Sequence, residues 1–119
     1  MKIQSNTIIK DSFELEGKTI PFTLHLTQMG KDVYKKRAEL GSKLEKSDED
    51  LEGFASTIVE MYELIFGESV TNELMEYYEG DAFGMLLETL PVLTEIVFPA
   101  LDRLRSDSLG KKMRLKQNG

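Results

Sequence analysis

Apolar and polar residues alternate over the first part of the chain, between residues 7 and 26. A period of two places the apolar side chains of a β-strand on one face. Gly17, near the middle of this region, can adopt the positive φ of a tight turn. We therefore predict a β-hairpin over residues 7–26, packed by its apolar face on helices, because an isolated hairpin is only marginally stable. The apolar positions of the two predicted strands are Ile9, Phe13, Leu15, Ile20, Phe22, Leu24 and Leu26.

Beyond residue 27 the apolar residues recur at intervals of three and four, the spacing of one face of a helix. We predict helices over residues 28–46, 48–66, 69–79 and 82–105. Local signals mark their ends. Ser47 and Asp81 are expected to cap the second and fourth helices, and Gly67 and Gly80 to end the second and third.

The segment 82–105 is apolar on more than one side. Pro91 and Pro99 each remove a backbone donor and clash with the preceding turn, so we expect a kinked or two-piece helix. The prolines, with Glu88 and Glu95, interrupt the ~20 apolar residues that a membrane span needs, and no membrane partner is expected. The predicted core stripe of this segment is Phe83, Leu86, Leu87, Leu90, Leu93, Val97, Leu101 and Leu104.

Together these elements predict an α+β fold that is mostly α, with an N-terminal β-hairpin packed on a small bundle of three to four helices. The 119 residues fit one domain, which we place at residues 1–106. Residues 107–119 are basic, lack an apolar period and are predicted to form a disordered tail. The predicted core consists of Phe13, Leu15, Phe22, Leu24, Val33, Phe54, Ile58, Tyr62, Ile65, Leu74, Leu86, Leu90 and Leu93.

The charges are distributed unevenly along the chain. The formal net charge is −6, but residues 45–95 hold fourteen acidic residues and one basic residue, a net charge of −13. So acidic a segment repels phosphates, and the four bases of the tail offer only weak, salt-sensitive attraction, so no nucleic-acid partner is expected. An acidic, solvated surface is the simplest interpretation of the segment.

Groups for catalysis are scarce in the sequence. It has no cysteine and one histidine, His25, which the strand alternation places on the polar side of the hairpin. The glycines form neither a dinucleotide-binding nor a P-loop pattern. The carboxylates of Asp48, Glu49 and Asp50 fit the first turn of a helix better than a metal loop. We therefore expect no enzyme activity, no cofactor and no metal.

The apolar surplus of residues 82–104 has two interpretations. Either this segment is the central core helix, or part of it is a contact surface for a protein partner or for a second copy of the chain. On the second interpretation, the predicted partner-binding residues are Met85, Phe98 and Leu101, of which Met85 and Phe98 lie off the predicted core stripe.

Two stretches resemble the tail-assembly chaperones of long-tailed phages and prophages of Gram-positive bacteria. They are FELEGKTIPFTL (13–24) and ELIFGESVTNELMEYYEGDAFGMLLETLPVLTEIVFPAL (63–101). The resemblance covers most of residues 7–105. It rests on Phe66-Gly67-Glu68, Val70, Leu74, Tyr77, Gly80, Asp81, Met85-Leu86 and the segment from Ile96 to Pro99.

The resemblance implies a viral protein of the bacterial host cytosol that binds a long, helical tape-measure protein until the tail tube assembles around it. Such chaperones are often made in two lengths by ribosomal frameshifting, for which the codons of residues 110–112 would be the expected place. An alternative of another class is an acidic regulator or inhibitor that binds a basic partner by charge mimicry, as the charge of residues 45–95 suggests.

Overall fold

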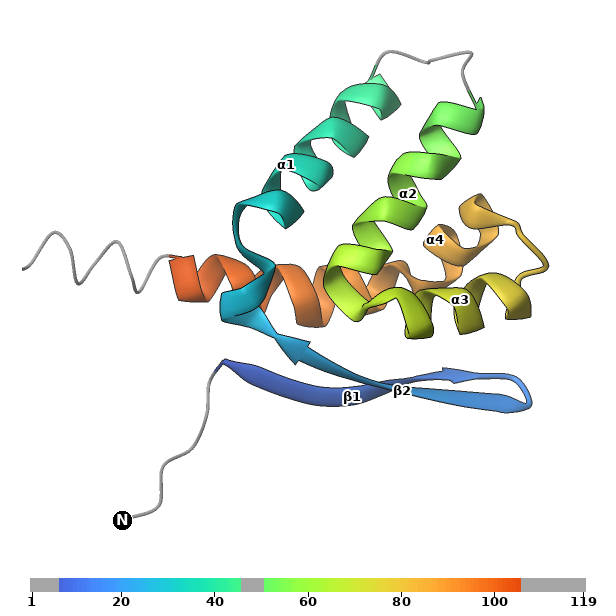
Figure 1. Cartoon of the computed structure of the whole chain (residues 1–119), viewed down its shortest axis with the longest axis horizontal. Helices are drawn as coiled ribbons and strands as arrows, with labels where there is room; N and C mark the ends of the chain where they lie inside the picture. Colours follow the sequence, from blue (N-terminus) through green and yellow to red (C-terminus); the bar gives the residue numbers. More distant parts are fainter. Residues whose placement is uncertain (1–6, 46–50, 106–119) are drawn as a thin grey trace, which may run out of the picture. The chain divides into compact units, whose positions relative to one another are not determined.

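The computed structural model describes residues 7–45 and 51–105 (Figure 1). It has an α+β fold that is mostly helical, as the sequence predicts. The elements in chain order are β1 (Ile8–Leu15), β2 (Lys18–His25), α1 (Leu26–Glu45), α2 (Leu51–Phe66), α3 (Glu68–Tyr77), α4 (Ala82–Pro91) and the π-helix η1 (Val92–Val97), followed by helical residues 98–105. By its internal contacts the chain divides into two compact units, Met1–Thr89 and Leu90–Gly119, so the single domain at 1–106 stays a prediction.

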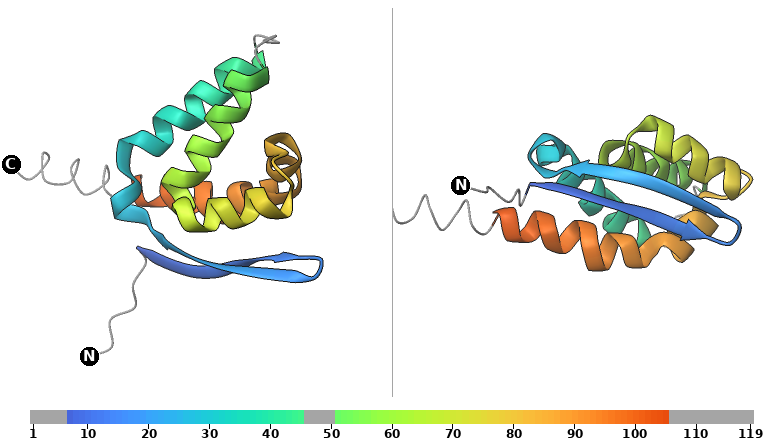
Figure 2. Two further views of the ribbon diagram at one scale, coloured as in Figure 1. Left: turned by 45° about the vertical axis from the view of Figure 1, so that its right-hand side comes forward. Right: turned by 90° about the horizontal axis from the view of Figure 1, so that it is seen from below.

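The hairpin has the predicted faces and turn. β1 and β2 pair antiparallel, with Phe13 opposite Ile20 and Ile9 opposite Leu24, and the strands lie side by side in all views (Figures 1 and 2). Gly17 occupies the turn at φ 79°, a conformation that costs glycine little. Pro21 is tolerated in β2 because both strands of a two-stranded sheet are edge strands.

An aromatic cluster joins the hairpin to the end of α2. The Phe66 ring lies 4.9 Å from that of Phe13 and 5.1 Å from that of Phe22, both nearly edge-on, and 5.6 Å from that of Tyr62. Such tilted and edge-on pairs stabilise beyond the burial of their area. At the other end of the hairpin, the Tyr77 hydroxyl donates to the carbonyl of Glu16 in the turn (3.1 Å). The hairpin thus packs on α2 and α3.

α1 and α2 form an antiparallel pair that extends away from the hairpin (Figures 1 and 2). α1 contributes Leu26, Met29, Val33 and Leu40 to the core at the predicted helical spacing. It begins two residues before the predicted start, at Leu26. The predicted start of α2 and its cap, Ser47, lie outside the described residues.

Glycine and aspartate mark the ends of α2, α3 and α4 as predicted. Gly67, at φ 90°, ends α2 and directly precedes α3, and Gly80 follows α3 at φ 83°. The Asp81 side chain accepts a hydrogen bond from the Gly84 N–H (3.0 Å) at the start of α4. A Cβ on residue 84 would lie 2.5 Å from an Asp81 carboxylate oxygen, so the cap favours glycine there.

Most of the predicted core is confirmed, and the errors fall mainly in α4. Phe13, Phe22, Leu24, Val33, Phe54, Ile58, Tyr62, Ile65, Leu74 and Leu93 are buried. Leu15 and Leu86 are only half-buried, and Leu90 is 39% exposed. The buried residues of α4 are Ala82, Met85 and Thr89 instead.

The π-helix explains why the predicted stripe is wrong in α4 and right beyond it. A π-helix carries more residues per turn than an α-helix, which shifts the helical phase. Leu93, Val97 and Leu101 are buried as predicted, whereas before η1 the buried positions Met85 and Thr89 each precede a predicted one by one residue. Of the two expected forms, kinked or two-piece, the structure contradicts the two-piece form, and the kink stays a prediction. The helix continues from Ala82 to Arg105, and the prolines coincide with a change of hydrogen-bond register, in which the Phe98 N–H donates to the Leu93 carbonyl five residues back.

The same helix is long and apolar enough to cross a membrane. Ala82–Arg105 reaches a mean hydropathy of 1.5 over 18 residues, of which 33% are buried. Core helices of soluble proteins meet this criterion too. Glu88 and Glu95, both exposed, make such a span costly because each charge near the middle of a bilayer costs about 2.5–3.5 kcal/mol.

A candidate protein-binding surface on α2 and α3

The residues with catalytic potential are dispersed. Among residues 7–45 and 51–105, no three histidine or carboxylate side chains gather as metal ligands would. His25 is exposed at the end of β2, on the polar side of the hairpin, as predicted. Asp48, Glu49 and Asp50 lie outside the described residues.

The three predicted partner-binding residues are mostly covered. Met85 is fully buried and Leu101 is 3% exposed, while Phe98 is half-buried. The side chains of Met85 and Leu101 are thus covered in this structure, and a role of the three residues in partner binding stays a prediction. The exposed leucine side chains of α4 are Leu87 (71% exposed) and Leu90, both of which the sequence predicted to face the core.

A more extensive surface follows the exposed side of α2. Three adjacent hollows lie along it. Glu60 lines the first two, and Glu63 and Leu64 line the last two. We name them the Met75 groove (about 500 Å³), the Leu64 hollow (about 450 Å³) and the His25 hollow (about 310 Å³). Their volumes fall in the range of about 300–1,000 Å³ that is usual for binding clefts.

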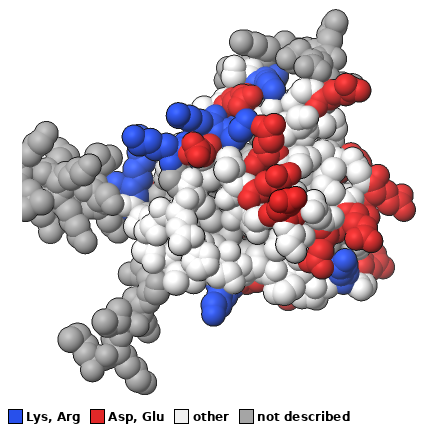
Figure 3. All heavy atoms as spheres, in the orientation of Figure 1, with Lys and Arg blue, Asp and Glu red and all other residues white. Residues whose placement is uncertain are grey.

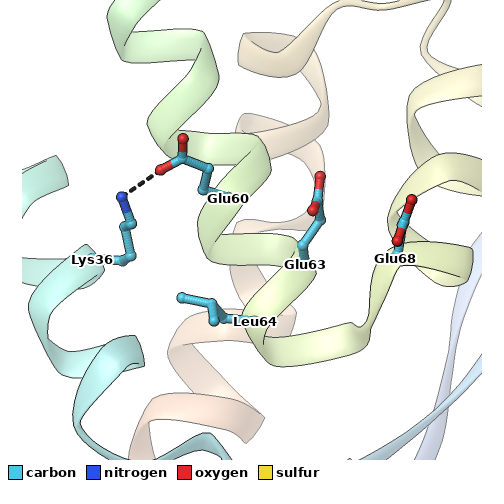
Figure 4. A pocket seen from close by; sticks show the side chains of 5 residues that line it. All are labelled: Lys36, Glu60, Glu63, Leu64 and Glu68. Carbon is cyan, nitrogen blue, oxygen red and sulfur yellow. Dashed lines mark hydrogen bonds and ion pairs between the residues drawn. The ribbon is translucent and has the colours of Figure 1, made fainter.

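The Leu64 hollow combines carboxylates with an exposed apolar side chain. Glu60, Glu63 and Leu64 come from α2, Glu68 from the first turn of α3, and Lys36 from α1. In Figure 4 the Glu60 side chain reaches toward Lys36, whereas Glu63 and Glu68 have no basic neighbour among the residues drawn. Leu64 points toward α1 and is 38% exposed.

The Met75 groove is largely apolar. Its lining comes from α2, α3 and the start of α4: Glu52, Ala55, Ser56, Val59, Glu60, Met75, Gly80 and Ala82. Ala55, Val59 and Met75 are half-buried and form its apolar part, and the carboxylates of Glu52 and Glu60 are exposed beside them. Within the described part of the chain, none of the lining residues is basic.

The charges of unit Met1–Thr89 separate by element. Acidic side chains form a band over α2 and α3, and basic side chains concentrate over α1 (Figure 3). Lys36 connects the two groups by donating to Glu60 and, at 3.3 Å, to Glu39. Glu60 first, and then Glu39, raises the pKa of Lys36 above its usual range. Lys43 donates to Thr57 Oγ1 (2.6 Å) and to the Gly53 carbonyl (3.2 Å), so it ties α1 to α2.

Comparison with protein-family models, with curated proteins and with solved structures finds no match to this chain.

Part of this surface had a signal in the sequence. The surplus of acids in residues 45–95 indicated an acidic face, and the structure places Glu52, Glu60 and Glu63 on α2 and Glu68, Glu73 and Glu76 on α3. The half-buried row of Ala55 and Val59 was missed, because it adjoins the apolar stripe of Phe54, Ile58 and Tyr62 and looks like its margin. This row becomes the wall of a groove only because Met75 of α3 and Ala82 at the start of α4 lie beside it.

Proposed function

We propose that the protein is a tail-assembly chaperone, which binds a tape-measure protein in the cytosol of a bacterial host during phage or prophage tail morphogenesis. The observation that carries the proposal is the surface along α2, where open hollows combine apolar side chains with carboxylates. The sequence resemblance in residues 13–24 and 63–101 names the partner class.

The physical argument concerns solubility. A long helical protein with apolar stripes aggregates when those stripes face water. A small partner that covers a stripe with Leu64, Val59 and Met75 replaces apolar surface with its own acidic exterior. A net charge of −6 on each bound copy then keeps the complex soluble through mutual repulsion. No catalytic group is needed for this task.

Co-expression tests the proposal directly. The full chain is expressed with the tape-measure protein encoded near its gene, and the soluble fraction of the tape-measure protein is compared with that obtained without the chain. We expect a several-fold increase and co-purification of both proteins. The variant Leu64→Asp should lose most of the effect, while Ile8→Asp, which changes an exposed apolar residue of β1, should keep it. A tape-measure protein that is equally insoluble with and without the chain would contradict the proposal.

The acidic band favours a second candidate, an acidic regulator that binds a basic protein by charge mimicry (Figure 3). The salt dependence of partner binding distinguishes the two candidate functions. Binding through exposed charges weakens steeply as ionic strength rises, whereas apolar contact depends on it little. Retention of the partner between 50 mM and 500 mM NaCl favours the chaperone, and complete release favours the regulator.

A further inference from the structure

We propose that the Met75 groove binds one amphipathic helix whose apolar stripe is flanked by lysine or arginine. This inference deepens the proposed function, since it names the docking site and the chemistry of the segment that binds there. It depends on the geometry of α2 and α3 and would hold equally for another helical partner.

The dimensions of α2 suit a helix. The part of α2 that lines the groove runs from Glu52 to Glu60, which corresponds to about 12 Å of helix rise or about two turns. A helix that lies along α2 would present apolar anchors at positions i, i+3 or i+4, and i+7. The small side chains Ala55 and Ser56 allow its backbone to approach closely, and Val59 and Met75 offer apolar contact.

Charge complementarity selects the flanking residues of that helix. Glu52 and Glu60 line the groove, Glu63 and Glu68 continue the acidic surface beyond it, and among residues 7–45 and 51–105 no base lines the groove itself. An acidic helix would be repelled, whereas lysine or arginine beside the apolar stripe would meet a carboxylate on α2.

Lys36 is an internal competitor for the same partner. Its ammonium group donates to Glu60, the residue shared by the Met75 groove and the Leu64 hollow. A cation of the bound helix must share Glu60 with Lys36 or displace it. Removing Lys36 should therefore strengthen binding, an effect in the opposite direction to that of damage to the fold.

The test uses three synthetic 16-residue peptides and the full chain. The first peptide has a leucine stripe flanked by lysines, the second has glutamates in place of the lysines, and the third has the first peptide's composition in scrambled order. Affinities are measured by fluorescence anisotropy at 50 and 500 mM NaCl. We expect at least tenfold tighter binding of the first peptide than of either other, with much of it retained at 500 mM NaCl.

Variants locate the site. Ser56→Arg places bulk and positive charge in the groove and should weaken binding of the lysine-flanked peptide at least tenfold. Asn72→Arg is the matched control, because Asn72 is an exposed polar residue of α3 that does not line the groove, and it should change binding less than threefold. Lys36→Met should tighten binding two- to fivefold. Circular dichroism melts show whether each variant is folded.

Several results would overturn the inference. Equal binding of the scrambled peptide would indicate attraction by charge alone, and equal binding of the acidic peptide would exclude charge complementarity. Equal weakening by Ser56→Arg and Asn72→Arg, or NMR shift changes outside residues 52–64 and 75–82, would place the peptide elsewhere. If the tape-measure protein stays soluble with the chain but the peptides bind elsewhere, this inference fails and the proposed function stands. If the peptides bind in the groove but the tape-measure protein stays insoluble, this inference stands and the proposed function fails.

Discussion

At the scale of single residues, a buried polar contact joins α2 to α4. Thr89 donates from its hydroxyl to the Met85 carbonyl (2.6 Å), so the Tyr62 hydroxyl donates to Thr89 Oγ1. Tyr62 is fully buried. Burial raises the pKa of Tyr62 to about 12. This pair satisfies two hydroxyls that would otherwise be buried at a cost of about 1–3 kcal/mol each.

This pKa predicts a loss of stability at alkaline pH. Below pH 10 Tyr62 is neutral in the folded and the unfolded chain. Between pH 10 and about 12 the unfolded chain releases the proton first, so unfolding becomes easier as pH rises. The loss from Tyr62 should amount to about 2–3 kcal/mol. Urea unfolding followed by circular dichroism at pH 7, 10 and 11.5 measures it.

The variant Tyr62→Phe isolates this contribution. It should cost about 0.5–1.5 kcal/mol at pH 7, where a hydrogen bond is lost, and should flatten the decline above pH 10. Some decline should remain, because burial and the nearby Glu88 also raise the pKa of Tyr78, whose buried hydroxyl has no hydrogen-bond partner among the described residues. Tyr77→Phe is the control for removing a surface hydroxyl, one that donates to Glu16. An unchanged slope in Tyr62→Phe would contradict the buried position of this ring.

At the scale of elements, the phase of α4 decides which side chains are core and which are surface. Met85 is fully buried and Leu90 is 39% exposed. Met85→Ala should therefore cost about 2–5 kcal/mol of the free energy of unfolding. Leu90→Ala should cost less than about 1 kcal/mol, since it opens no cavity in the core. Thermal and urea unfolding of both variants test the order, and a larger loss in Leu90→Ala would show that the helical phase of α4 is wrong.

The elements differ in how far the sequence predicts them. The hairpin follows from alternation and Gly17, and the helix ends follow from Gly67, Gly80 and Asp81, because these signals act within a few residues. The phase of α4 does not follow, since it depends on the π-helix between Pro91 and Pro99. A π-helix has no characteristic amino-acid composition. A stripe traced at 3.6 residues per turn therefore continues through it without the change of phase.

The candidate site, too, is predicted by the sequence only in part. Its charge is a sum over residues and is visible in the sequence, so an acidic face could be predicted from residues 45–95. Its shape arises where α2, α3 and the start of α4 meet, and Ser56 lies far in sequence from Met75 and Gly80. The hydrophobicity of Met85 and Leu101 is visible in the sequence, whereas their burial is visible only in the structure.

At the scale of the whole molecule, the concentrated negative charge should oppose folding. Residues 45–95 carry a net charge of −13, and the basic side chains on α1 offset it only locally, as in the pair of Lys36 and Glu60. Repulsion between exposed charges extends over about 30 Å at 0.01 M salt and about 8 Å at 0.15 M. The melting temperature should therefore rise as NaCl increases from 10 to 300 mM. A fall would mean that the ion pairs of α1 outweigh the repulsion.

The variant Glu76→Lys tests whether the negative charge that opposes folding also contributes to partner binding. Glu76 is exposed in the last turn of α3, where the helix dipole disfavours a negative charge, so the change should add about 0.3–1 kcal/mol of stability and reduce the salt dependence of the melting temperature. Glu14→Lys makes the same charge change at an exposed position of β1, outside the acidic band, and should change the stability less.

Glu76 does not line the Met75 groove. Its replacement by lysine should nevertheless weaken binding of a lysine-flanked helix at 50 mM NaCl and leave it nearly unchanged at 500 mM, because only the long-range electrostatic field differs. A variant that gains stability and loses affinity together would indicate that the acidic band of α2 and α3 is kept for the partner at the expense of the fold. A gain in stability with unaltered affinity at low salt would show that the acidic band does not contribute to binding. Its charge would then serve solubility alone.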